Sequence, residues 1–84
     1  MVIVRMWEAR GNPDTHDELV AWACQAADDV EGDLACAGAE VFTSMDLRVV
    51  VISRWRVVPP PFPRPPRRLV SREPHAWDFA PVDR

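Results

Sequence analysis

The chain has no lysine and no tyrosine, only three glycines and two cysteines among its 84 residues, and no long uninterrupted apolar run. A membrane-spanning helix needs about 18 consecutive apolar residues, and a secretory signal needs an apolar segment near its start. Gly11, Gly32 and Gly38 are too scattered to form a glycine-rich phosphate loop. We therefore expect a soluble, cytoplasmic protein that has no membrane partner.

The two cysteines, Cys24 and Cys36, have neither the CxxC spacing nor the clustered histidines of a zinc site. In a reducing compartment such cysteines stay as thiols, and free cysteine behaves as a small apolar residue that is usually buried. We therefore predict two buried thiols, no metal site and no cofactor.

Acidic and basic residues are separated along the chain, whose net charge is −3. Residues 1–46 hold ten acids against two arginines, whereas residues 47–84 hold eight arginines against three acids. Halves of opposite charge can pair within one subunit or across two, whereas a dedicated nucleic-acid binder usually carries a net basic domain. A domain this short also buries only about 60% of its unfolded surface. We therefore expect a homodimer and no nucleic-acid partner.

Three segments rich in β-branched and aromatic residues predict strands, at residues 2–8, 39–44 and 48–56. The last is apolar on both faces at its centre, so we expect it inside the sheet. Between the first two, apolar residues at helical spacing predict a helix that begins at residue 14 or 16 and ends at 31. Its apolar stripe consists of Leu19, Trp22, Ala23, Ala26 and Val30.

The segments that flank this helix carry two further signals. Thr15 and Glu18 have the spacing of a capping box, in which each side chain binds the other residue's backbone N–H. Gly32 is placed to end the helix. We predict a linker of small residues at 33–38.

Residues 59–66, which we call the arm, contain six prolines and exclude a helix or a central strand. They predict a stiff polyproline II segment of roughly 25 Å. Residues 67–84 follow and are too apolar to be left in water, and 76–79 alternate like a short strand. We divide the chain into an α+β domain at 1–58, the arm, and a tail at 67–84 that packs on the domain or exchanges onto a partner subunit. A role of the arm as a ligand for an aromatic-lined groove is the alternative.

Three short segments carry a resemblance to a known family: Val2–Trp7, Gly38–Phe42 and Arg48–Trp55. They resemble strands of the dimeric α+β-barrel superfamily that includes antibiotic-biosynthesis monooxygenases, over residues 2–56. The resemblance implies a ferredoxin-like βαββ layout with an antiparallel sheet, two subunits whose sheets pair into a barrel, and C-terminal segments that cross over.

This chain departs from that family after Trp55, which matches the tryptophan that ends the corresponding strand. In the family a second helix with a histidine follows, and here the arm replaces it, while His75 lies too far along the chain to stand for that histidine. The Asn, Trp and His of the haem-degrading branch are not carried over, because Asn12 lies beyond the first strand.

The candidate ligand-binding residues are Trp7, Trp22, Trp55 and His75. The tryptophans could line a cavity for a small hydrophobic or aromatic molecule, and the alternative that we favour is packing in the core or an interface. His75 could move protons if Asp78 oriented it, but three residues of strand put the two side chains on opposite faces. We identify no catalytic residue.

Six arginines form a basic run that could grip phosphates: Arg54, Arg56, Arg64, Arg67, Arg68 and Arg72. Pairing with the acidic helix, or with its copy in a second subunit, is the interpretation that we favour.

The sequence therefore predicts a small homodimeric α+β-barrel protein, and it favours a binding or structural member without catalysis, because no acid, base or metal set is found. The alternative is a cofactor-independent, monooxygenase-like enzyme that acts on a small aromatic molecule. That alternative requires a ligand-sized cavity between helix and sheet, lined by the tryptophans.

Overall fold

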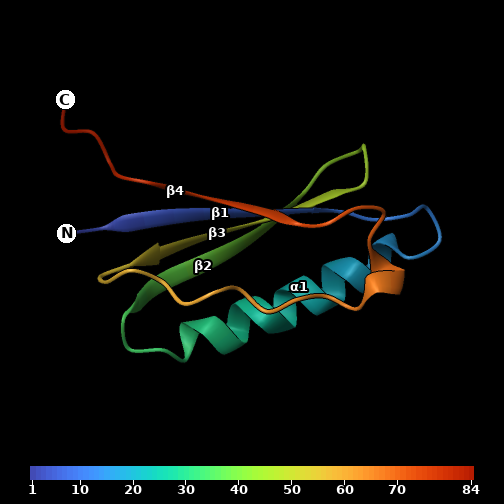
Figure 1. Cartoon of the computed structure of the whole chain (residues 1–84), viewed down its shortest axis with the longest axis horizontal. Coiled ribbons are helices and arrows are strands. Elements are labelled where there is room, and N and C mark those ends of the chain that lie inside the picture. The colour runs from blue at the N-terminus through green and yellow to red at the C-terminus, as the bar shows by residue number, and fades with distance from the viewer.

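The computed structural model describes residues 1–84 as a four-stranded antiparallel sheet with one α-helix on one of its faces (Figure 1). The strand order is β2-β3-β1-β4, so the first and third strands lie at the centre. The structure contains no helix with the length and hydrophobicity that a membrane span requires. The elements are β1 (Ile3–Arg10), α1 (His16–Glu31), β2 (Cys36–Thr43), β3 (Arg48–Trp55), the 3-10 turn η1 (Arg67–Leu69) and β4 (His75–Phe79).

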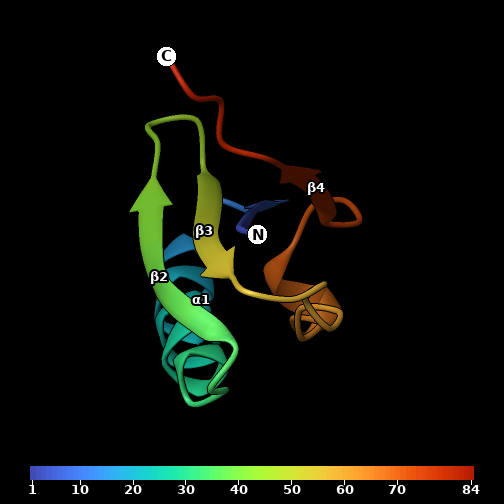
Figure 2. The same ribbon diagram turned by 90° about the vertical axis from the view of Figure 1, so that its left-hand side faces the viewer.

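This topology confirms the predicted α+β class and the ferredoxin-like layout. All three strand pairs are antiparallel, so β1 runs parallel to β2, and β3 runs parallel to β4. Each parallel pair needs a crossover connection. The first crossover is α1, and the second is the segment 56–74, which holds no α-helix. Both crossovers lie on the same side of the sheet (Figure 2).

Alternation along the two central strands decides which side chains meet the helix. In β3, Val49, Val51, Ser53 and Trp55 are buried, and the residues between them are not. Successive strand residues point to opposite faces, so this set lies on the helix side. Ser53 is polar but satisfied, because its hydroxyl accepts a hydrogen bond of 2.8 Å from the indole N–H of Trp55.

The core lies between this side of the sheet and the small residues of α1. Alanines at helical spacing let the helix approach the sheet closely, and Leu19 is the large side chain that fills the contact. One cluster therefore joins α1, β1, β3 and η1. Its buried members are Trp7, Ala9, Leu19, Ala23, Ala27, Val49, Val51 and Leu69.

Two details at the helix start and in β2 differ from the prediction. Thr15 makes no capping hydrogen bond with its side chain. Its hydroxyl instead accepts from the N–H of Asn12 at 3.3 Å and donates to the carbonyl of Leu69 at 3.3 Å, so the capping box is wrong. β2 begins at Cys36, inside the predicted linker and three residues before the predicted strand start, because a bulge between Cys36 and Gly38, with φ of 140° at Gly38, lets the small residues stay paired with β3.

The two cysteines are free thiols, but the prediction that both are buried is wrong. Cys24 is exposed and Cys36 is half-buried. Cys24 follows Ala23, which is fully buried, and one residue turns a helix by about 100°. Cys24 therefore points away from the sheet.

The arm packs beside α1 with a repeat of three residues. Pro59 and Pro65 are buried and Phe62 is half-buried, while the residues between them are exposed. Three residues per turn is the period of a polyproline II helix, so one of its three rows faces the protein. The Phe62 ring is 4.8 Å from the Trp7 ring and 6.1 Å from the Trp22 ring, centroid to centroid.

We expect Phe62→Ala to lower the free energy of unfolding by about 2 kcal/mol, below the range for a fully buried phenylalanine because this ring is only half-buried. Pro61→Ala, one residue earlier on an exposed row, is the matched control and should change it far less. Denaturant unfolding monitored by tryptophan fluorescence measures both. Equal losses in the two variants would contradict the anchoring role of Phe62.

Candidate functional site

The sheet surface opposite α1, which we call the open face, is apolar and uncovered by any other element of the chain (Figure 1). Register places its side chains in rows across the strands, with Met6 between Ile52 and Trp77 and with Val4 beside Phe79. Trp77 and Phe79 remain 43% and 53% exposed. The apolar members of the open face are Val4, Met6, Phe42, Val50, Ile52, Trp77 and Phe79.

Most charged groups of the open face are already paired, and Arg10 at the end of β1, opposite Arg48, is the exception. Glu8, whose side chain is 12% exposed, forms ion pairs with Arg48 and Arg72. Glu40 and Arg54 pair at 3.6 Å on neighbouring strands. A shallow hollow of about 280 Å³ lies beside the turn between β2 and β3, and Met6, Phe42 and Val50 line it. Paired charges lower the cost of covering the apolar surface that they border.

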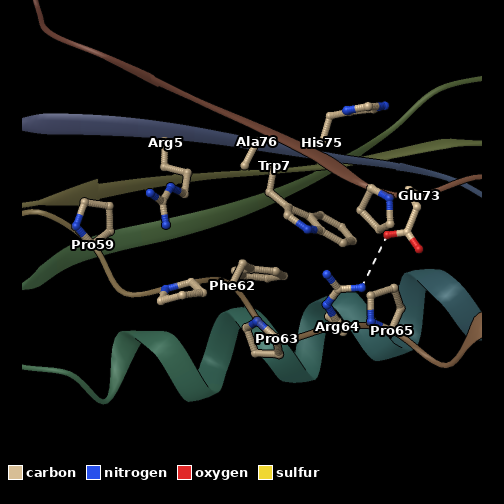
Figure 3. Close-up of a pocket in the computed structure, with 12 residues that line it drawn as sticks. Arg5, Trp7, Pro59, Phe62, Pro63, Arg64, Pro65, Glu73, His75 and Ala76 are labelled. Atoms are coloured by element: carbon tan, nitrogen blue, oxygen red, sulfur yellow. Dashed lines mark hydrogen bonds and ion pairs between the residues drawn. The ribbon is translucent and has the colours of Figure 1, made fainter.

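A second concave surface lies on the helix side, between the arm and β4, and we call it the cleft (Figure 3). Its volume is about 370 Å³, which is within the range of small-molecule sites. Trp7 and Phe62 form its aromatic wall, and Arg5, Arg64 and Ala76 border it.

Arg5 ties together the three segments that border the cleft. Its guanidinium donates two hydrogen bonds to the carboxylate of Asp78 on β4, at 2.7 and 2.9 Å, and one to the Pro60 carbonyl at 2.7 Å. The hydrogen bond from Arg5 lowers the pKa of the Asp78 carboxyl below its ordinary value. One side chain of β1 therefore holds both the arm and the edge strand.

The structure separates the predicted ligand-binding residues. The ring centroids of Trp7 and Trp22 are 5.8 Å apart, and both rings contact Phe62. Trp55, in contrast, is 2% exposed and pairs with Ile3 across the sheet. Trp7 pairs with Val51, and four residues of strand span roughly 13 Å. The three tryptophans therefore do not line one cavity, and the space between helix and sheet is filled by the core.

His75 and Asp78 lie on opposite faces of β4, as their spacing predicted. Asp78 turns to Arg5 on the helix side, and the His75 ring stacks on Trp77 of the open face at 5.9 Å. Figure 3 shows the His75 ring directed away from Trp7. Asp78 therefore does not orient His75 for proton transfer.

Two residues that line the cleft, Arg5 and Phe62, were missed from the sequence. Phe62 had a signal, because Pro59, Phe62 and Pro65 share the three-residue spacing of one polyproline II row. Arg5 had none, since its partner Asp78 lies 73 residues away.

The basic run pairs with acids in several places rather than forming one patch. Arg68 binds Glu18 of α1 at 2.7 Å, which lowers the pKa of that carboxyl. Arg64 lies 3.4 Å from Glu73, and Arg56 donates to the Leu34 carbonyl. No group of three or more potential metal-ligating side chains converges anywhere in the chain.

Comparison with known proteins gives one informative likeness. No protein-family model matches the chain, and no curated protein matches its sequence. The solved structure of Rv0793 from Mycobacterium tuberculosis superposes with a TM-score of 0.78 at 15% sequence identity, covering 100% of this chain and 98% of that chain. This likeness shows the fold. Membership of the monooxygenase-like superfamily stays a prediction.

We expect β4 to loosen in acid because of Asp78. A carboxyl with a lowered folded pKa contributes stability above its unfolded pKa and loses it as the pH falls through the folded value. The loss should therefore begin near the ordinary value of 3.8 and grow below it. Because the Asp78 side chain is 41% exposed, the loss of stability should be at most about 1 kcal/mol. Amide exchange of β4 against pH measures it.

Asp78→Asn should remove this pH dependence, and Asp83→Asn, in the exposed tail, is the matched control. If β4 amides of the Asp78→Asn variant keep the same acid response, the Arg5 pairing does not hold the strand.

Proposed function

We propose that the protein is a homodimer in which the open faces of two copies pack together as an α+β barrel, and that it serves as a binding or structural protein. The observation that carries the proposal is the apolar open face, with aromatic side chains left in water. Contiguous exposed apolar surface of this kind marks an interaction site. Residues of both sheets would interdigitate as in other face-to-face sheet packings.

A second copy suits this surface for two reasons. A two-fold interface joins the same patch on both subunits, so each must be self-complementary. Here paired charges on neighbouring strands, Arg54–Glu40 and Arg48–Glu8, border an apolar centre. The charged residues at the rim can then form ion pairs with the opposite charges of the second copy, and the apolar centre of one copy packs on the apolar centre of the other.

The tail belongs to the same proposal. β4 supplies Trp77 and Phe79 to the open face, and the extended arm precedes it. Within one chain β4 pairs with β1, and exchange of residues 67–84 between two copies would place the same contacts across the dimer. In either arrangement both aromatic rings enter the interface.

Ile52→Arg should convert the dimer to a monomer, because Ile52 lies in the central row between Glu40 and Met6 and an unpaired charge there cannot be buried cheaply. Light scattering after size exclusion should show the mass fall from twice 9.5 kDa to 9.5 kDa. Leu34→Arg, at a residue 94% exposed outside the sheet, is the control and should stay dimeric.

Circular dichroism should show that both variants are folded. A folded Ile52→Arg variant that stays dimeric, or an unmodified chain that is monomeric at micromolar concentration, would contradict the proposal.

A second candidate function is supported by the cleft. Its volume of about 370 Å³ and its wall of Trp7 and Phe62 suit the binding of a small aromatic molecule. Both bordering arginines already have partners, since Arg5 binds Asp78 and the Pro60 carbonyl and Arg64 lies 3.4 Å from Glu73, so apolar and stacking contacts would dominate.

1-Naphthol is a suitable probe, and its binding should quench tryptophan fluorescence. Ala76→Leu should weaken the binding several-fold, because a larger side chain at Ala76 intrudes on the cleft. Ala37→Leu, at an exposed alanine of β2, is the control. Quenching that both variants leave unchanged would exclude the cleft as the binding site.

A further inference from the structure

The arm exposes two of its three rows to solvent in a fixed conformation. Pro59, Phe62 and Pro65 face the protein, and Pro60, Pro63 and Pro66, each exposed, form a ridge of three prolines at three-residue spacing. The backbone of Pro66, with φ of −53° and ψ of 136°, is that of polyproline II. The third row is Pro61, Arg64 and Arg67, all exposed.

The ridge is held in place from below. Phe62 packs on Trp7 and Trp22, and Arg5 donates to the Pro60 carbonyl. Prolines have no backbone N–H, so the segment cannot join the interior of a sheet. The carbonyls of Pro60 and Pro66 already accept hydrogen bonds, from Arg5 and from the Leu69 N–H, and the Pro63 carbonyl between them remains available as an acceptor. An extended segment fixed in this way loses little entropy on binding.

We propose that the ridge of Pro60, Pro63 and Pro66, with Arg64 and Arg67 beside it, is a docking surface for a partner protein whose groove is lined by aromatic side chains and bordered by carboxylates. Prolines spaced by three fit between parallel aromatic rings. Arg64, whose side chain is 86% exposed and lies 3.4 Å from Glu73, can turn to a carboxylate of the partner.

This surface is independent of the proposed dimer. The arm lies on the helix side of the sheet (Figures 1 and 2), so two copies joined through their open faces leave the ridge of each free. A dimer would then present two ridges, and a partner with two grooves would gain avidity from both.

The probe for this test is an isotopically labelled SH3 domain with an acidic, aromatic-lined groove, titrated with the full chain and followed by NMR. We expect saturable shifts confined to its groove. Pro63→Ala should weaken binding about tenfold, as expected when a central interface contact is lost. Pro81→Ala, an exposed proline outside the arm, should leave binding unchanged. Arg64→Glu should weaken it and reduce its salt dependence.

A synthetic peptide of residues 57–68 separates presentation by the fold from the composition of the arm. The full chain should bind more tightly than the peptide, because the arm is ordered before it binds. The proposal is overturned if the full chain gives no saturable shifts, if Pro81→Ala weakens binding as much as Pro63→Ala, or if the peptide binds at least as tightly as the chain. Tryptophan near-ultraviolet circular dichroism verifies that each variant is folded.

Discussion

A four-stranded sheet has two faces, and the helix and the arm of this chain cover only one of them. α1 and the arm both lie on the same side (Figure 2), where Trp7 and the β3 residues Val49 and Val51 become the core. The opposite side keeps Trp77 and Phe79 in water. Because an apolar face of this kind is costly in water, the assembly that we propose follows from this imbalance.

The arm forms the connection from β3 to β4 in place of a second crossover helix, and it has a different secondary structure. Helices satisfy their own backbone groups, whereas a polyproline II segment has no internal hydrogen bonds and must be held from outside. Phe62 on Trp7 and Arg5 on the Pro60 carbonyl provide that support. A slim segment also covers less of the sheet than a helix, which is why a cleft remains between the arm and β4.

The fold was largely predictable, because period-two and helical spacing report burial directly. The strands, α1 and the absence of a second helix followed from local pattern. What failed depends on contacts distant in sequence. Thr15 had the right spacing for a capping box, but η1 offers its hydroxyl the Leu69 carbonyl instead. The site was less predictable still, since Trp55 was grouped with Trp7 by residue type alone and Arg5 meets Asp78 only after the sheet has formed.

The central claim is that a second copy covers the open face, and contacts between two differently labelled copies test it most directly. In a mixture of isotope-labelled and unlabelled chains, an isotope-filtered NOE experiment reports only contacts between subunits. The account predicts intermolecular NOEs from the methyl groups of Val50 and Ile52 to the open-face rings of Trp77 and Phe79. Intermolecular NOEs that are absent, or that involve α1 instead, would contradict it.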